Sequence, residues 1–375
     1  MRRITFPLYV GGFLGPFGGA MLAAIIPNVA LGLDASIAQV AATITTYMVP
    51  FALLQLVSGT LAERLGPRRV VRTGYVAFGL AALACALAPE NWSFLAARAA
   101  MGAANAFLSP ILLAALSEVV APDVLGRTVG TFAAAQTAGL MLAPVLGGLL
   151  GEISWRLAFV LVAVVSVALA IPKQTLGTME WQPRSNGQAS LRALLNRWIA
   201  LLATQATLGY LGFTAIGFVL VLVGADEFGL GSGTRGLLIA GYGVGGILLG
   251  RFAGSVVDRA GRPASALAGA IACTVGVLGL IVAPSAWSLG LVYFGIGCAS
   301  TFVWAGLNTI AVESFPENRA GATSAYSAFK FAGVAIAPLI YVPLFNVDSR
   351  LPFVLAAAFS ALLAVLVLPW FARYS

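Results

Sequence analysis

Twelve long apolar runs divide this chain, and they constrain its fold more than any other feature. A hydrocarbon core about 30 Å thick requires roughly 20 apolar residues per helix. Only 9% of the 375 residues are charged and the mean hydropathy is +0.97, whereas soluble domains carry about a quarter charged residues. The sequence therefore predicts an all-α integral membrane protein with twelve transmembrane helices. The predicted spans are 7–33, 37–62, 70–88, 91–118, 126–150, 155–172, 197–223, 233–257, 264–283, 286–312, 320–345 and 351–371.

The distribution of basic residues predicts the orientation. If the amino terminus lies in the cytoplasm, sixteen of the 21 Lys and Arg residues fall in cytoplasmic loops and tails, while Arg156, Arg235 and Arg350 fall outside. Positively charged loops resist translocation, so we expect both termini in the cytoplasm, in a bacterial-type inner membrane. We expect the run from Pro7 to Leu33 to remain as a helix, because it is too long for a signal peptide.

A charged turn occurs twice at a constant spacing. A repeat at about half the chain length predicts two copies of one unit. Between the copies, 173–195 is the one long polar segment and the predicted cytoplasmic linker, which leaves six-helix bundles at 1–172 and 196–375. Gly59, Glu63, Arg64 and Gly66 are matched, 195 positions later, by Gly254, Asp258, Arg259 and Gly261.

Two bundles of six spans, a central linker and a repeated charged turn together resemble the major facilitator superfamily of secondary transporters, over the whole chain. The first turn resembles the signature between the family's second and third helices, with Glu63 where aspartate is usual. The resemblance implies a pseudo-symmetric two-bundle fold, and a cytoplasmic latch in which these turns and acids at other helix ends join the two halves. The latch residues are Glu63, Arg64, Arg68, Glu118, Asp258, Arg259 and Glu313.

The span 126–150 carries a second resemblance. Its stretch from Gly139 to Gly148 is similar to the antiporter signature Gly-x-x-x-Gly-Pro-x-x-Gly-Gly, with Ala143 replacing one glycine. This similarity implies the drug:proton antiporter branch. Small residues allow close helix approach and proline bends a helix, so two interpretations stay open: a gating helix on which the halves rock, or plain packing against the span 233–257. The gating residues are Gly139, Pro144, Gly147 and Gly148.

Two cations, Arg98 and Lys330, lie inside predicted spans. A charge at the centre of a membrane helix costs at least about 2.5–3.5 kcal/mol, so it is by default a functional hypothesis. Arg98 followed by Gly102 also resembles the family's intramembrane arginine motif. A structural role, with backbone carbonyls or hydroxyls as partners, is the alternative. The predicted substrate-binding residues are Arg98, Asn105, Gln205, Trp304, Asn308, Tyr326 and Lys330.

No acid accompanies these cations, because all thirteen Asp and Glu residues fall at helix ends or in loops. Many drug:proton antiporters of the superfamily carry a carboxylate in the first helix, several residues before a proline. The corresponding stretch from Gly18 to Pro27 has none. A coupled proton then needs another carrier: the substrate, a deprotonated Lys330 or Asp34 near the outer mouth.

We therefore predict a secondary active transporter that moves small organic or amphipathic molecules by rocker-switch alternating access, as proton-coupled efflux. The alternative is an organic-anion uniporter or exchanger that uses Arg98 and Lys330. The chain has no sizeable extramembrane domain that would favour a membrane scaffold. It also has no nucleotide loop and no paired intramembrane carboxylates that would favour an enzyme. We expect a monomer in lipid with no cofactor, no nucleic-acid partner and no metal site. The chain has no histidine, which excludes a histidine-bearing metal site or proton relay.

Overall fold

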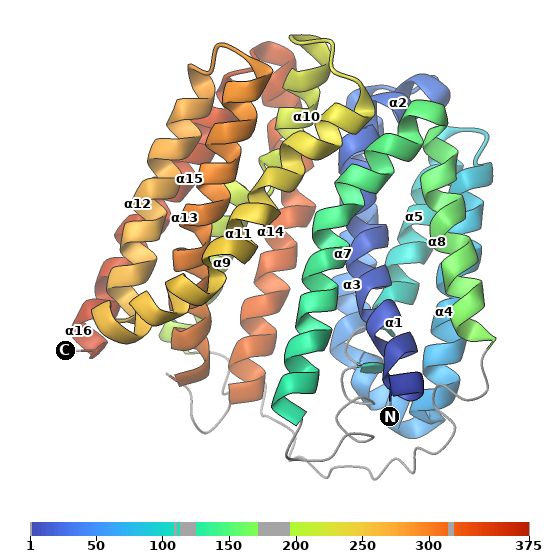
Figure 1. The fold of residues 1–375 in the computed structure, drawn as a ribbon, viewed down its shortest axis with the longest axis horizontal. Coiled ribbons are helices and arrows are strands. Elements are labelled where there is room, and N and C mark those ends of the chain that lie inside the picture. Colours follow the sequence, from blue (N-terminus) through green and yellow to red (C-terminus); the bar gives the residue numbers. More distant parts are fainter. Residues whose placement is uncertain (1, 109–110, 113–124, 172–195, 314–318, 375) are drawn as a thin grey trace. The chain divides into compact units, whose positions relative to one another are not determined.

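The computed structural model describes residues 2–108, 111–112, 125–171, 196–313 and 319–374 (Figure 1). All regular elements in these ranges are helices, η1 and η6 being of the 3-10 type and η4 a π-helix. The elements are α1 Arg2–Ala20, η1 Met21–Ile25, α2 Ile26–Gly32, α3 Ile37–Leu65, α4 Pro67–Leu87, α5 Asn91–Asn105, α7 Leu125–Ile153, α8 Trp155–Ala170, α9 Arg197–Gly209, η4 Tyr210–Thr214, α10 Gly217–Asp226, α11 Ser232–Ala260, α12 Arg262–Ile281, α13 Ala286–Glu313, α14 Arg319–Val347, α15 Leu351–Val367, η6 Leu368–Trp370 and α16 Phe371–Tyr374.

The predicted spans correspond to these helices. By length and apolarity, nine helical segments of the described residues qualify to cross a membrane, and bent α11 makes a tenth if its two parts count as one span. The apolar α8 is shorter, and α5 covers the first part of the span 91–118, of which residues 109–110 and 113–118 lie outside the described ranges. The all-helical membrane fold is therefore confirmed.

The helix bounds repeat between the two halves of the chain. α3 and α11 correspond at an offset of 195 residues at both ends, and α7 and α14 at an offset of 194 at both ends. The starts of α4 and α12, and those of α5 and α13, are also 195 residues apart. The repeat seen in the charged turn thus extends along whole helices.

The repeated turn has the same backbone geometry in both copies. Gly66 separates α3 from α4 with φ 85°, and Gly261 separates α11 from α12 with φ 93°. This left-handed region is readily accessible to glycine and costly for other residues. A proline follows within two positions, Pro67 and Pro263, and its fixed φ suits the first turn of a helix. Glycine and proline together therefore produce a sharp reversal between two long helices.

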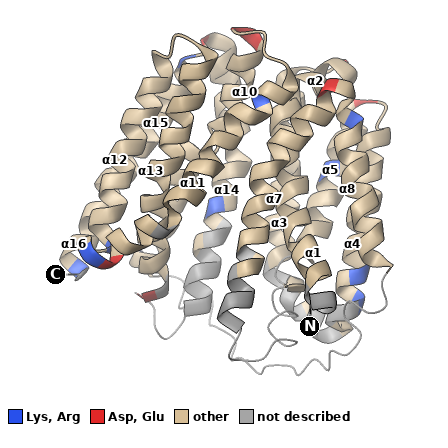
Figure 2. Ribbon diagram, in the orientation of Figure 1, with Lys and Arg blue, Asp and Glu red and all other residues tan. Residues whose placement is uncertain are grey.

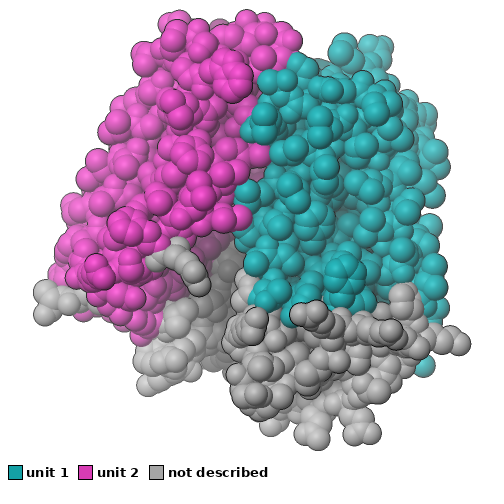
Figure 3. Space-filling model, viewed as in Figure 1, with its two compact units in different colours: residues 1–184, 231–237 teal, residues 185–230, 238–375 magenta. Residues whose placement is uncertain are grey.

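The chain forms two compact units, drawn in different colours in Figure 3. Unit 1 comprises residues 1–184 and 231–237, and unit 2 comprises residues 185–230 and 238–375. In unit 1, α1 packs on α7, α3 on α5 and α4 on α8, while in unit 2, α12 packs on α13 and α15, and α9 on α14. The linker 173–195 lies outside the described residues and stays a prediction.

The first span of each half is interrupted. In unit 1, α1 gives way to η1 before α2, and in unit 2 the π-helix η4 separates α9 from α10. A change of helix type alters the regular hydrogen-bond pattern and leaves carbonyl groups that need other partners. Repeat-built transporters place their binding sites at such discontinuous helices, so polar groups beside the two interruptions are candidates for a site.

Candidate functional site

Lys330 lies part-way along α14. Figure 2 shows the described Lys and Arg residues in blue, with a blue stretch within α14. Its ammonium nitrogen donates a hydrogen bond to Oδ1 of Asn308 at 3.2 Å. It also lies 4.1 Å from the ring centroid of Tyr326 and 5.1 Å from that of Trp304. These three neighbours are neutral, so the contacts stabilise the cation without cancelling its charge. We call Lys330, Asn308, Trp304 and Tyr326 the Lys330 cluster.

Further aromatic groups connect this cluster to the interruption in the seventh span. The ring of Trp304 lies 5.1 Å from that of Tyr210 and 5.5 Å from that of Phe213, both in η4. The indole nitrogen of Trp304 donates to the hydroxyl of Tyr242 at 3.5 Å. π-helical turns often mark functional sites, and here η4 carries two of the rings that surround Trp304.

The Lys330 cluster is accessible in part. Asn308 is exposed, Lys330 and Trp304 are half-buried, and only Tyr326 is buried, at 2% exposure. Three of its four side chains therefore present surface to a ligand. The structure brings together all four predicted binding residues from the spans 286–312 and 320–345.

Arg98 has a different environment, inside unit 1, with no exposed surface. Its Nη1 and Nη2 donate to the carbonyl oxygens of Gly18 and Gly19, at 3.0 and 3.4 Å, where α1 approaches η1. Its guanidinium lies 4.3 Å from the ring centroid of Tyr47. This is the structural alternative, with backbone carbonyls as partners. The placement gives no support to substrate contact by Arg98.

The same arrangement recurs in unit 2 at the repeat offset. Positions 195 residues after Gly19, Tyr47 and Arg98 are Thr214, Tyr242 and Tyr293. The hydroxyl of Tyr293 donates to the carbonyl oxygen of Thr214 at 3.2 Å, and the rings of Tyr293 and Tyr242 stack with centroids 5.2 Å apart. In each unit, a polar side chain from the fourth helix of the repeat thus holds a carbonyl beside the interruption of the first. Arg98 donates to backbone carbonyl oxygens in unit 1, and the neutral phenol of Tyr293 does the same in unit 2.

Two further predicted binding residues are interior. Asn105 is 4% exposed in α5, and Gln205 is fully buried in α9. The amide of Gln205 donates to the carbonyl oxygen of Leu366 at 2.7 Å and accepts from the indole nitrogen of Trp370 at 3.1 Å. Both ends of this amide are therefore engaged within unit 2. Gln205 therefore does not belong to the Lys330 cluster, and Asn105 belongs to unit 1.

The glycines of α7 lie at close backbone contacts. A side chain at Gly139 would collide with the carbonyl oxygen of Phe13 in α1, and one at Gly147 would come within 2.6 Å of the carbonyl oxygen of Met21. These contacts explain why α1 and α7 pack together, because only a residue without Cβ permits such an approach.

α7 also contacts the start of α11. A side chain at Gly148 would collide with the carbonyl oxygen of Ser232, and one at Gly236 would collide with that of Pro144. The hydroxyl of Ser232 donates to the carbonyl oxygen of Gly148 at 2.7 Å. Through these contacts, residues 231–237 belong to unit 1. The contacts are close packing between α7 and the start of α11, which is one of the two interpretations of the glycine stretch. The gating role stays a prediction.

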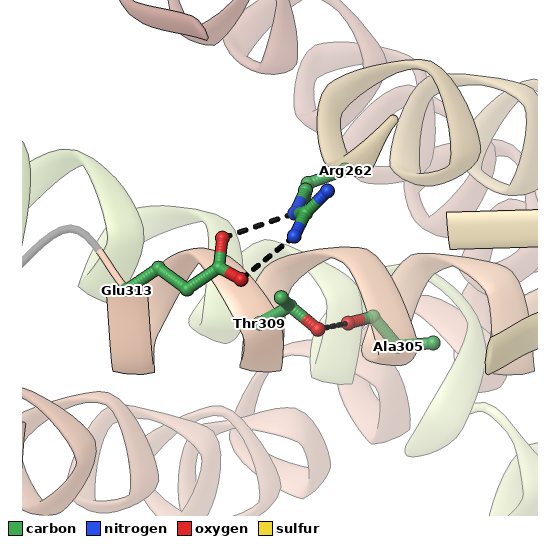
Figure 4. Close-up of polar contacts among 4 residues, drawn as sticks. All are labelled: Arg262, Ala305, Thr309 and Glu313. Atoms are coloured by element: carbon green, nitrogen blue, oxygen red, sulfur yellow. Dashed lines mark hydrogen bonds and ion pairs between the residues drawn. The ribbon is translucent and has the colours of Figure 1, made fainter. Parts of the chain in front are cut away.

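The latch residues are described in part. The side chains of Glu63, Arg64 and Arg68, and the whole of Glu118, lie outside what the structure describes. Asp258 and Arg259 are exposed near the end of α11. Figure 4 shows Glu313, at the end of α13, in a bidentate ion pair with Arg262 at the start of α12, at 2.8 and 3.0 Å. Glu313 is thus paired with Arg262, which lies in unit 2 and is not one of the predicted latch residues.

Sequence reasoning missed three site residues: Tyr47, Tyr242 and Tyr293. A buried tyrosine hydroxyl usually needs a hydrogen-bond partner, and tyrosines within apolar spans were the available signal. The second signal was the offset, which relates Tyr47 to Tyr242.

Known proteins similar to this chain include several named for drug resistance. It is 33% identical to a "Multidrug resistance protein B homolog" of Mycobacterium tuberculosis over 143 residues, which are 36% of this chain and 26% of that protein. It is 24% identical to "Multidrug efflux protein YfmO" of Bacillus subtilis over 343 residues, 84% of this chain and 80% of that one. The chain spans about a quarter to a third of the length of the first curated relatives that it matches.

Solved structures share the fold at low sequence identity. A D-xylose-proton symporter superposes with a TM-score of 0.80 at 15% identity, over 97% of this chain and 96% of that one. A mutant of the nucleoside transporter NupG superposes with a TM-score of 0.78 at 13% identity, over 98% of this chain and 100% of that one. The sequence pattern described as Major Facilitator Superfamily matches residues 8–338 and, in a second match, residues 202–375. This chain belongs to the major facilitator superfamily.

Proposed function

We propose that this transporter exports small organic or amphipathic molecules across the cytoplasmic membrane by alternating access, in exchange for protons. The observation that carries the proposal is the similarity, over 84% of this chain, to a protein named for multidrug efflux. The drug-resistance name of a second relative and the antiporter-like stretch Gly139–Gly148 support the same direction of transport.

The Lys330 cluster is the proposed substrate contact. It combines a partly exposed cation, an amide and aromatic rings beside an interrupted helix. Aromatic and apolar surface with a few polar groups is typical of sites that hold small organic molecules. The glycines of α7 and the charged turns are the proposed conformational elements, because they lie at close packing and at helix ends.

Proton exchange is the part that needs the most direct test. The described acids lie near helix ends or between helices, so the proton carrier is proposed to be Lys330, Asp34 or the substrate itself. Purified protein in proteoliposomes should move compounds from a panel of puromycin, ethidium and aromatic acids, and an imposed pH gradient should change the rate. Movement indifferent to the gradient would refute proton coupling, and no movement of any compound would refute organic efflux.

Orientation is a separate proposal. With both termini in the cytoplasm, the turn between α14 and α15 faces the outside of the cell. A Ser349→Cys variant in this turn should therefore react with a membrane-impermeant maleimide in intact cells. The three native cysteines would first be replaced with alanine. Labelling of a Ser375→Cys variant, and not of Ser349→Cys, would reverse the proposed orientation.

A further inference from the structure

We propose that the Lys330 cluster binds the anionic group of an aromatic organic anion, so that this transporter selects acids among small organic molecules. The inference rests on the proposed function, which leaves the charge of the substrate open. It assigns the role of anion receptor to Lys330 and Asn308, and the role of ring contact to Trp304 and the neighbouring Tyr210.

The charge of Lys330 is not cancelled by its neighbours. Lys330 is half-buried and its contacts are an amide oxygen and two rings. Among the described residues, an ion pair forms between Arg262 and Glu313, and no carboxylate pairs with Lys330. A cation withdrawn from water without an opposite charge is costly, and an anion that arrives with the substrate offsets this cost.

The Lys330 cluster offers several hydrogen-bond donors. An ammonium group has three donors, and one of those on Lys330 is used by Asn308. In the described part of the chain, the buried hydroxyl of Tyr326 has no hydrogen-bond partner. The amide of Asn308 is exposed and brings two N–H donors. A carboxylate or sulfonate accepts several such bonds, whereas an ammonium group accepts none and is repelled by Lys330.

The aromatic rings beside Lys330 favour a ligand that carries a ring. The ammonium nitrogen lies 5.1 Å from the ring centroid of Trp304, which is half-buried and adjoins the ring of Tyr210. An anion held by Lys330 thus has an aromatic surface close by, and aromatic rings prefer offset-stacked or edge-to-face contact. The fitting ligand carries its acid group directly on a ring or a short distance from it.

The repeat shows that these groups are particular to one half. α14 corresponds to α7 at an offset of 194, which matches Lys330 with the neutral Gln136. The position of Trp304 corresponds to Ser109, and that of Tyr210 to Gly15. The cation and both rings are therefore additions to the shared scaffold, in contrast to the tyrosine pair Tyr47 and Tyr242, which both halves retain.

Binding of 2-naphthoate to the purified protein in detergent tests the inference, with 2-naphthamide as a neutral ligand of similar shape and 2-naphthyltrimethylammonium as a cation. Isothermal titration should show that 2-naphthoate binds more tightly than either. Lys330→Gln should weaken 2-naphthoate binding by about 10- to 100-fold, as expected for hydrogen bonds to a charged group. The same variant should leave binding of the amide within about threefold.

Two variants separate charge from folding. Asn308→Asp places a carboxylate beside the ammonium nitrogen, so it should reduce 2-naphthoate binding as strongly as Lys330→Gln while Lys330 remains. Arg197→Gln removes an exposed cation whose guanidinium lies 5.3 Å from the Trp198 ring centroid, and it is the matched control that should change nothing. Each variant is compared only after its melting temperature matches that of the wild type.

The outcomes distinguish this inference from the proposed function. If the cation or the amide binds and is transported while 2-naphthoate is neither bound nor moved, organic transport stands and anion selection is refuted. If 2-naphthoate binds and Lys330→Gln binds it equally well, the assignment to this cluster is refuted. If 2-naphthoate binds with the expected variant effects but no compound is transported in proteoliposomes, the binding site stands and the transport proposal fails.

Discussion

Arg98→Met tests whether the buried cation of unit 1 holds the fold or meets the substrate. Methionine keeps an unbranched apolar side chain of similar length but removes the donors to the carbonyl oxygens of Gly18 and Gly19. Each buried acceptor left unsatisfied costs about 1–3 kcal/mol. Relief of the desolvation of the cation offsets part of that sum. We therefore expect a net loss of about 2–4 kcal/mol in the free energy of unfolding.

The assay is a thermal melt in detergent with a thiol-reactive fluorogenic dye. The buried Cys85 and Cys273 report unfolding because they react when the bundles open. Arg156→Met is the control, since this partly exposed arginine donates to one carbonyl oxygen, that of Ala88, at 3.2 Å, and should cost less than about 1 kcal/mol. An Arg98→Met protein that melts like the wild type, yet loses binding of anionic ligands alone, would show that Arg98 is a substrate group.

Three further substitutions test other parts of the structure. Tyr293→Phe removes the donor to the carbonyl oxygen of Thr214 in unit 2 and should lower stability by about 1–3 kcal/mol; an unchanged melting curve would contradict the proposed equivalence with Arg98. Gly139→Leu should abolish folded protein in size-exclusion chromatography, because its Cβ collides with a backbone oxygen of α1, and a well-folded variant would show that α7 can shift. Glu63→Gln should change the transport rate while the relative affinities for ligands stay the same, and altered selectivity at an unchanged rate would contradict a latch.

The fold was predictable because its signals are long and additive. Apolar runs of about 20 residues mark spans irrespective of tertiary detail, and the repeated turn carries its own geometry in Gly66 and Gly261. The interruptions at η1 and η4 were not predicted. They depend on whether a carbonyl group finds a partner from another helix, such as Tyr293, and local sequence does not contain that contact.

The candidate site was predictable only for residues that lie on the same face of one helix, where that face contacts another helix of the site. Trp304 and Asn308 are four residues apart, as are Tyr326 and Lys330, so each pair lies on one helix face, and the structure joins the two faces. Gln205 was among the predicted binding residues. Its side chain turns to α15 and η6 instead, because helix rotation about its own axis is set by packing and not by span number.

Comparison of the two repeats distinguishes a structural cation, Arg98, from a candidate binding cation, Lys330. Arg98 has a counterpart, Tyr293, that makes the same kind of carbonyl contact without a charge. A role that a phenol fills in one half does not require a cation in the other, so the charge of Arg98 is not by itself a reason to place an anion there. Lys330 corresponds to Gln136, and the neighbouring Trp304 corresponds to Ser109. The protein's own carbonyls thus offset the cost of a charge in the membrane at Arg98, whereas at Lys330 we propose that a ligand offsets it.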